Sequence, residues 1–208
     1  SSEVALFGEN GPCKVNGEGI GTERNPYSWN TNANLIYIDQ PTGTGFSYGS
    51  GHIFGEEGVA KDMLDFLKQF FSTHSQYKDN KFFVFGESYA GHYVPAVSHA
   101  VWAYNRAAPA AEKINLKGVA IGNGLTDPAI QYNYYAKMAV NNTYGVKAVS
   151  RPEVNAMVEE LSKCIPLIEQ CQNDTSVCSE AQAECNQGQL GPYEMSGLNP
   201  YDVREPCK

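Results

Sequence analysis

The first half of the chain alternates short apolar runs with amphipathic stretches. Residues 34–39 and 81–85 are apolar runs bounded by turn-forming residues, and a third run at 116–121 ends in Gly-Asn-Gly. Apolar runs of this length with such boundaries predict buried strands. Residues 58–74 predict a helix, with one apolar face formed by Val59, Met63, Phe66, Leu67 and Phe70.

A second helical stretch follows residue 88. Its stripe consists of Ala96, Val97, Ala100, Val101 and Tyr104. Pro95 either opens this helix or kinks it, because proline lacks the backbone N–H that a helix interior needs. Strands that alternate with helices predict an α/β class, with a parallel sheet covered by helices on both faces.

The pattern changes near Asp127. Beyond it the chain is helix-prone, with a helix expected over 154–163, and then rich in cysteine, with a disulfide-held loop expected over 172–200. We expect no further strand there. The sequence therefore predicts two parts, a partial α/β core at 1–128 and an insertion or cap at 129–208.

Composition and charge exclude several classes of protein. The 208 residues are 42% hydrophobic and include 13 Tyr and 9 Phe, which is enough to fill a core and argues against disorder. The net charge of −8, without a basic stripe, argues against nucleic-acid binding. No apolar run approaches the roughly 18 residues of a transmembrane helix.

Four of the six cysteines recur every seven residues, namely Cys164, Cys171, Cys178 and Cys185. A zinc site would need four thiolates at an unusual spacing, since no histidine follows His99. Disulfides in an oxidising compartment fit better. Glycosylation sequons at Asn141 and Asn173 agree with that compartment.

Two segments match the Gly-x-Ser-x-small pattern of a nucleophile elbow. Ser88, within Gly-Glu-Ser-Tyr-Ala, follows a predicted strand and precedes a predicted helix, whereas Ser47 lies between two loops. An elbow requires a strand before the serine and a helix after it, so that Oγ is exposed at the end of the strand. The sequence therefore favours Ser88 as a nucleophile.

None of the histidines fits the role of its general base. His52 and His74 precede Ser88, and His92 and His99 lie on its own helix. Enzymes of this class place the histidine last, in the order Ser, Asp or Glu, His. We therefore expect a fragment, or one chain of a nicked enzyme.

The segment 86–95, Gly-Glu-Ser-Tyr-Ala-Gly-His-Tyr-Val-Pro, resembles the active-site signature of the serine carboxypeptidases. Further stretches agree in the family's order: Ser1-Ser2, Glu9-Asn-Gly-Pro12, Asn25-Pro-Tyr-Ser-Trp-Asn30, Asp39-Gln-Pro41, Gly45-Phe-Ser-Tyr48, Ile121-Gly-Asn-Gly124 and Tyr201-Asp202. The resemblance runs nearly end to end. It implies an α/β-hydrolase fold with a helical, disulfide-bearing insertion.

The resemblance also implies roles for single residues. Ser88 attacks the last peptide carbonyl, and the backbone N–H of Tyr89 is one oxyanion donor. Glu9 and Glu87 recognise the terminal carboxylate of the peptide, which implies an acidic pH optimum because a protonated carboxyl can donate to a carboxylate. No cofactor and no metal are expected.

The resemblance implies nested disulfides, Cys164–Cys185 and Cys171–Cys178. We expect Cys13 and Cys207 to need partners elsewhere, and Cys13 has no equivalent in the family pattern. The catalytic Asp and His are expected in a missing segment or a second chain. Expected partners are peptides with a free C-terminus and that remainder of the enzyme, with a homodimer as a further option. The expected compartment is a lysosome or vacuole, or the cell exterior.

Three alternatives stay open. A lipase or esterase would use the same elbow but would not need Glu87 beside the nucleophile. An acyltransferase relative tends to carry Asp before the serine. A chain that kept the fold as a binding or scaffold protein would not need Ser88 at all.

Overall fold

The computed structural model describes residues 2–51 and 53–207. The chain forms two compact units. The first comprises Ser1–Glu87 and His92–Gly122, and the second comprises Ser88–Gly91 and Asn123–Lys208. The chain therefore passes from one unit to the other and back at the turn that carries Ser88.

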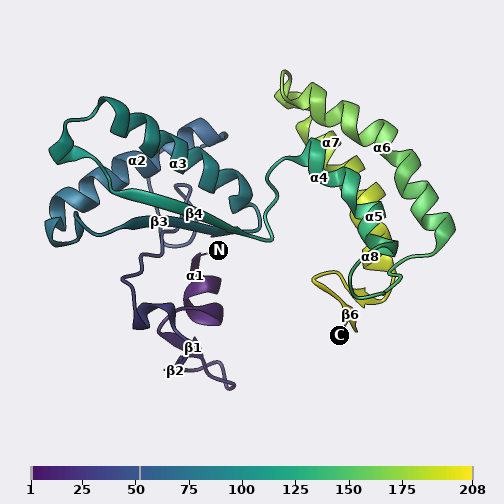
Figure 1. Ribbon diagram of the computed structural model, residues 1–208, viewed down its shortest axis with the longest axis horizontal. Coiled ribbons are helices and arrows are strands. Elements are labelled where there is room, and N and C mark those ends of the chain that lie inside the picture. Colours follow the sequence, from purple (N-terminus) through teal and green to yellow (C-terminus); the bar gives the residue numbers. More distant parts are fainter. Residues whose placement is uncertain (1, 52, 208) are drawn as a thin grey trace. The chain divides into compact units, whose positions relative to one another are not determined.

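A parallel strand pair forms the centre of the first unit. Strands β3 (Phe82–Glu87) and β4 (Leu116–Gly122) run in parallel register as far as the pair Glu87 and Gly122. Helices α2 (Glu56–Thr73) and α3 (Ala90–Ala107) lie along the same face of this pair (Figure 1). Short 3-10 turns, η3 (Ser75–Tyr77) and η4 (Ala110–Glu112), precede the two strands. The strands at 81–85 and 116–121 and the two helices predicted for this unit are confirmed, but both described helices lie on one face of the strand pair, whereas helices on both faces were predicted.

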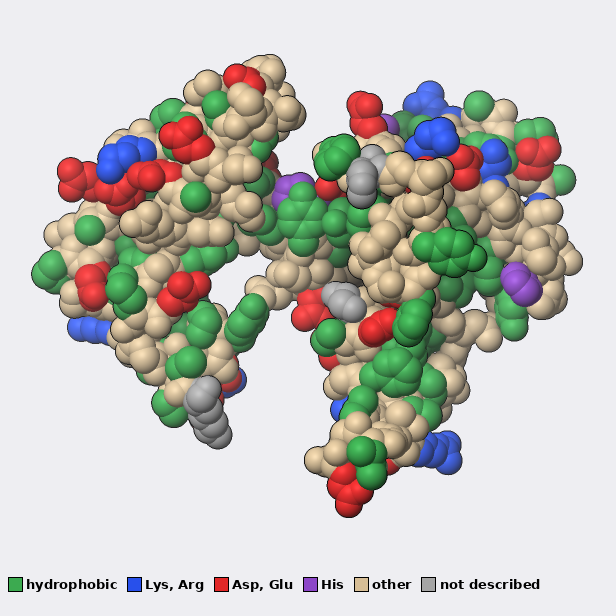
Figure 2. Space-filling model, turned by 180° about the vertical axis from the view of Figure 1, so that it is seen from behind, with side chains coloured by type: hydrophobic (Ala, Val, Ile, Leu, Met, Phe, Trp, Pro, Cys, Tyr) green, Lys and Arg blue, Asp and Glu red, His purple; other side chains and the backbone are tan. Residues whose placement is uncertain are grey.

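The apolar stripes of α2 and α3 build the core of this unit. The buried set is Val59, Leu67, Phe71, Val97, Val101 and Ile114, with Phe82 and Leu116 packed against it. Pro95 lies inside α3 and does not open it. On the opposite face of the strands Phe83 and Phe85 stay 46% and 58% exposed. Figure 2 shows hydrophobic side chains reaching the surface of this unit.

The N-terminal segment adds a separate two-stranded sheet to the first unit. It contains α1 (Ser2–Val4), a π-helical turn η1 (Ala5–Glu9), an antiparallel hairpin of β1 (Cys13–Val15) and β2 (Thr22–Arg24), and a 3-10 turn η2 (Trp29–Thr31). The strand expected over 34–39 is wrong. Among the described residues no strand pairs with this segment, so its backbone bonds elsewhere; for example, Ser2 Oγ donates to the Ile38 carbonyl at 2.5 Å.

The second unit is mostly helical. Its elements are α4 (Pro128–Gln131), η5 (Tyr132–Tyr134), α5 (Tyr135–Val140), α6 (Arg151–Cys171), η6 (Thr175–Val177), α7 (Cys178–Cys185), η7 (Asn186–Leu190), α8 (Gly191–Met195), β5 (Leu198–Asn199) and β6 (Asp202–Pro206). Helix α6 starts at a capping box, where the Ser150 N–H donates to Glu153 Oε2 at 2.6 Å and the Ser150 hydroxyl accepts in return.

Two expectations for this unit are wrong. The stretch 172–200 is not a loop, because α7 and α8 form there, and β5 and β6 form an antiparallel hairpin where no strand was expected. Both differences have a tertiary cause. The short helices bury Ala181, Cys185 and Tyr193 against the rest of the unit, and such packing outweighs weak local propensity.

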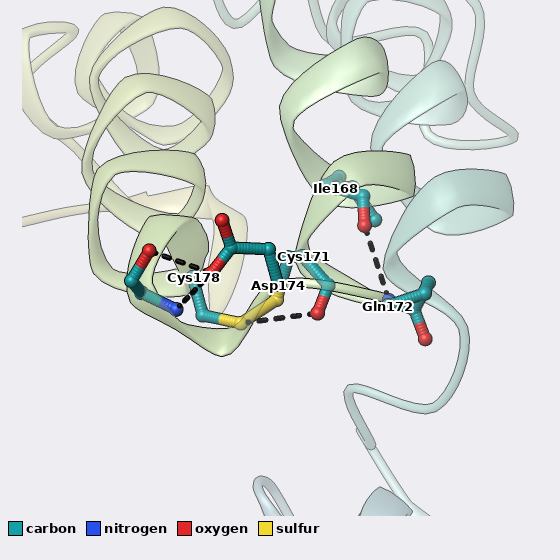
Figure 3. The surroundings of a disulfide bond; sticks show 6 residues. Ile168, Cys171, Gln172, Asp174 and Cys178 are labelled. Carbon is teal, nitrogen blue, oxygen red and sulfur yellow. Dashed lines mark hydrogen bonds between the residues drawn. A yellow bond between two sulfur atoms is a disulfide. The ribbon is translucent and has the colours of Figure 1, made fainter.

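Two disulfides join α6 to the segment that follows it. Cys164 bonds Cys185 and Cys171 bonds Cys178, with Cα atoms 4.9 Å and 4.8 Å apart (Figure 3). This is the nested pairing that the resemblance implies. Beside the Cys171–Cys178 disulfide, Asp174 is the N-cap of η6. Its side chain accepts hydrogen bonds from the backbone N–H and the hydroxyl of Ser176. Cys13 and Cys207 are free within the described part of the chain.

Candidate active site

Ser88 lies on a sharp turn between a strand and a helix. β3 ends at Glu87, α3 begins at Ala90, and Ser88 has φ = 60°. A residue with a Cβ takes this left-handed conformation at a cost, which the surrounding structure must sustain. The strand, the strained serine and the helix together have the form of a nucleophile elbow.

Backbone contacts hold the turn in this form. The Ser88 carbonyl accepts hydrogen bonds from the N–H of Gly91 at 3.0 Å and of Leu125 at 3.1 Å. A Cβ on Gly91 would lie 2.6 Å from the Leu125 carbonyl oxygen, which is closer than two such atoms can approach. In this turn Gly91 therefore has to be glycine, because the backbone at Leu125 packs directly against it.

Tyr89 follows the serine and is 47% exposed. In α/β hydrolases the N–H of the residue after the nucleophile is one oxyanion donor, and a second donor comes from another loop. Tyr89 therefore occupies the position at which the first donor is expected.

Ser47, the competing serine, lies in a loop. Its hydroxyl donates to the Asp39 carbonyl at 2.6 Å, and the N–H of Phe46 donates to Asp39 Oδ2 at 3.1 Å. No strand leads into this serine and no helix follows it directly. The hydroxyl therefore holds the 39–47 loop together.

Two of the described histidines make ring contacts within the first unit, and a third lies inside a helix. His74 ends α2 and packs against Phe70, with ring centres 4.8 Å apart, and His99 stacks on Trp102 at 5.5 Å. His92 lies within α3. His52 lies outside the described residues.

Glu9 and Glu87 form a pair of carboxyl groups. Burial, the charge of Glu87 and a hydrogen bond with Glu87 together raise the pKa of Glu9 above its ordinary value of 4.5. The charge of Glu87 opposes ionisation of Glu9, so Glu9 keeps its proton to a higher pH. Glu9 can thus present a neutral, proton-donating carboxyl at a higher pH than an isolated glutamate would.

Hydrogen bonds hold the backbone next to Glu9. The Asn25 amide donates to the carbonyls of Glu9 and Gly11 at 3.2 Å and 2.9 Å, and the Asn25 N–H donates to the Pro12 carbonyl. The Asn10 carbonyl accepts from the Trp29 N–H at 3.0 Å and from Ser28 Oγ at 3.2 Å. Four consecutive carbonyls are thus satisfied, which fixes the backbone that carries Glu9.

Sequence reasoning missed the part played by Asn25, which is only 3% exposed. A signal was present, because 25–30 was part of the family resemblance and a buried amide must find hydrogen-bond partners. Tyr37 was missed as well. It was assigned to a buried strand, yet its hydroxyl donates to Asn10 Oδ1 at 2.6 Å.

The remaining candidate residues lie in the second unit. Asn141 ends α5 and Asn173 follows α6, and both side chains are exposed. Within the described ranges no group of three or more His, Cys, Asp or Glu residues is placed to hold a metal ion. No described helix is long and apolar enough to cross a membrane.

Comparison with known proteins agrees with this geometry. The family model for serine carboxypeptidase matches residues 1–208. The chain belongs to the serine carboxypeptidase family. Carboxypeptidase Y of Schizosaccharomyces pombe is 41% identical over the whole chain, and carboxypeptidase Y of Saccharomyces cerevisiae is also 41% identical over the whole chain.

A solved structure shows the same fold. A prohormone-processing carboxypeptidase from Saccharomyces cerevisiae matches 96% of this chain with a TM-score of 0.71 and 28% identity, and the match covers 43% of that structure. The predicted α/β-hydrolase class with a helical, disulfide-bearing region is confirmed. The chain spans 22% of the length of the first of these carboxypeptidase Y relatives and 39% of the second.

Proposed function

We propose that this chain supplies the nucleophile of a serine carboxypeptidase, an enzyme that releases C-terminal amino acids from peptides at acidic pH. The observation that carries the proposal is Ser88, held at φ = 60° between β3 and α3. This strain exposes Oγ at the end of the strand, where a bound peptide carbonyl can be attacked.

The proposed chemistry proceeds through an acyl-enzyme. Ser88 Oγ attacks the last peptide carbonyl while a histidine takes its proton, and the same histidine returns that proton to the leaving amino acid. Water then releases the shortened peptide. The Tyr89 N–H stabilises the oxyanion. The histidine, its aspartate partner and the second oxyanion donor are proposed to come from parts of the enzyme outside this sequence.

The carboxyl pair of Glu9 and Glu87 gives the specificity for a free C-terminus. A protonated carboxyl donates a hydrogen bond to the substrate carboxylate, whereas two ionised groups would repel it. The raised pKa of Glu9 keeps this donor in place at a higher pH than an isolated glutamate would.

We place a catalytic core at 1–128 and a cap at 129–208. Cys13 and Cys207 pair with cysteines of the remainder, and a disulfide from Cys207 can hold a second chain. Asn141 and Asn173 carry glycans, and the enzyme acts in a lysosome or vacuole or outside the cell, alone or as a homodimer.

The test is release of a C-terminal amino acid from an N-acylated dipeptide by the complete enzyme and by its Ser88→Ala variant. Loss of the nucleophile should leave less than about a thousandth of kcat. Ser47→Ala is the matched control and should retain most activity. Hydrolysis of esters without any release of amino acids would instead indicate a lipase or esterase, and turnover unchanged by Ser88→Ala would overturn the proposal.

A further inference from the structure

A tyrosine hydroxyl lies next to the candidate carboxylate subsite. Tyr37 Oη donates to Asn10 Oδ1 at 2.6 Å, across 27 positions of sequence. Asn10 directly follows Glu9 and is the C-cap of η1. Its N–H donates to the Ala5 carbonyl at 3.0 Å. The Tyr37 hydroxyl therefore anchors the residue next to Glu9.

This anchor differs in kind from the others around Glu9. Asn25, Ser28 and Trp29 donate to backbone carbonyls, whereas Tyr37 holds a side chain, that of Asn10. It also comes from another part of the chain, the segment 34–39. The bond thus ties the end of η1 to a second segment and restricts rotation of the backbone at Glu9.

Tyr37 is also close enough to Glu9 to sense its charge. Burial, followed by the negative charge of Glu9, raises the pKa of the Tyr37 phenol above its ordinary value of 10.0. The phenol therefore stays neutral at any acidic working pH and keeps its proton for Asn10.

We propose that Tyr37 is a positioning residue of the carboxylate subsite: through its hydrogen bond to Asn10 it holds Glu9 opposite Glu87, and so sets the affinity for peptides with a free C-terminal carboxylate. The inference rests on the proposed function of the two glutamates. It assigns Tyr37 no contact with substrate and no part in the proton transfers at Ser88.

The position of Glu9 influences binding more than chemistry. The terminal carboxylate takes no part in the bonds that form and break at the scissile carbonyl and keeps its charge throughout the reaction, so its contacts are similar in the ground state and the transition state. Weakening such uniform binding raises KM and leaves kcat unchanged.

The experiment compares complete wild-type enzyme with Tyr37→Phe, which removes only the hydroxyl. Two matched substrates are used, an N-acylated dipeptide with a free C-terminus and the same dipeptide amidated. Loss of one neutral hydrogen bond should raise KM for the free acid about three- to tenfold. Values of kcat for both substrates and KM for the amide should change less than about twofold.

A matched control and a second variant separate positioning from general damage. Tyr201→Phe removes a hydroxyl from an 87% exposed tyrosine between β5 and β6 and should change neither substrate's constants. Asn10→Leu removes the acceptor, so it should mimic Tyr37→Phe. Because both substitutions break the same bond, the double variant should be no worse than either single variant.

Three outcomes would overturn the inference. An unchanged KM for the free acid in Tyr37→Phe would show that the hydroxyl does not position Glu9. Equal changes for acid and amide, or additive effects of the two substitutions, would reduce Tyr37 to a purely structural role. If wild-type enzyme releases amino acids but does not distinguish acid from amide, the glutamate pair itself fails; if it releases none, the proposed peptidase function fails.

Discussion

Ser88 and Asn123 take the same uncommon backbone conformation at equivalent places on neighbouring strands. Each follows the last register pair of the two strands, Glu87 and Gly122, and their φ angles are 60° and 42°. Two residues after Asn123, the Leu125 N–H donates to the Ser88 carbonyl. A residue of positive φ therefore follows each strand, and the Leu125 N–H helps hold the strained serine.

This relationship makes Gly91 a sensitive position. In Gly91→Ala the new Cβ would lie 2.6–2.8 Å from backbone atoms of Leu125, and backbone cannot move aside as a flexible side chain can. We expect a loss of about 1–3 kcal/mol in the free energy of unfolding, measured by urea denaturation. Gly17→Ala is the control, because nothing lies within 4 Å of its Cβ position. Equal stability of the two variants would contradict the close packing.

The two disulfides should differ in their contribution to stability. Cys164–Cys185 spans 21 positions and Cys171–Cys178 spans 7. Loop-closure entropy then gives about 3 kcal/mol for the first and about 2 kcal/mol for the second. The pair Cys164 and Cys185 is also buried, so paired Cys→Ala substitution there should lower the urea midpoint more. The reverse order would count against this account.

Protein stability should depend on pH through Glu9. Its pKa is raised in the folded state, so its favourable contribution is fully present below the ordinary value of 4.5 and is lost as pH rises through the raised value. Glu9→Gln cannot titrate. The free energy of unfolding of wild type, measured relative to this variant, should therefore fall as pH rises above 4.5 and through the raised pKa of Glu9.

The control for this measurement is Glu18→Gln, at an exposed position between β1 and β2. Its difference from wild type reports what the Glu→Gln change contributes at an exposed position outside the pair. A Glu9→Gln difference that does not depend on pH would contradict the raised pKa of Glu9.

The same pair should shape the activity profile. For peptides with a free C-terminus, kcat/KM should fall as pH rises through the raised pKa of Glu9, because the proton donor is lost. An amidated substrate should not show this limb, and Glu9→Gln or Glu87→Gln should flatten it for the free acid. If the fall of kcat/KM at higher pH is unchanged in both variants, these glutamates do not recognise the substrate carboxylate.

Much of the strand and helix pattern near Ser88 could be predicted from the sequence. The run at 81–85 and the stripe on 58–74 carry their own periodicity, and turn residues mark their ends. The segment 34–39 has an equally apolar pattern but is not a strand. A strand depends on hydrogen bonds to a neighbour, and no single segment encodes whether that neighbour is present.

The second unit was harder to predict for a related reason. Its helix at 178–185 is short and weakly amphipathic, and it is fixed by its bonds to α6 through Cys171 and Cys164. The residues that hold the backbone at Glu9 could not be predicted from the sequence either. Asn25 and Tyr37 lie 16 and 28 positions from Glu9, and only the folded chain brings them to that segment.

The most direct test of the central claim is labelling of the complete native enzyme with a fluorophosphonate probe, followed by peptide mapping of the adduct. The probe reacts covalently with an activated serine and reports the nucleophile whatever the substrate. The account predicts a single adduct on the peptide that contains Ser88, blocked by prior denaturation. An adduct on Ser47 or on any other serine, or none in an enzyme that still releases C-terminal amino acids, would contradict it.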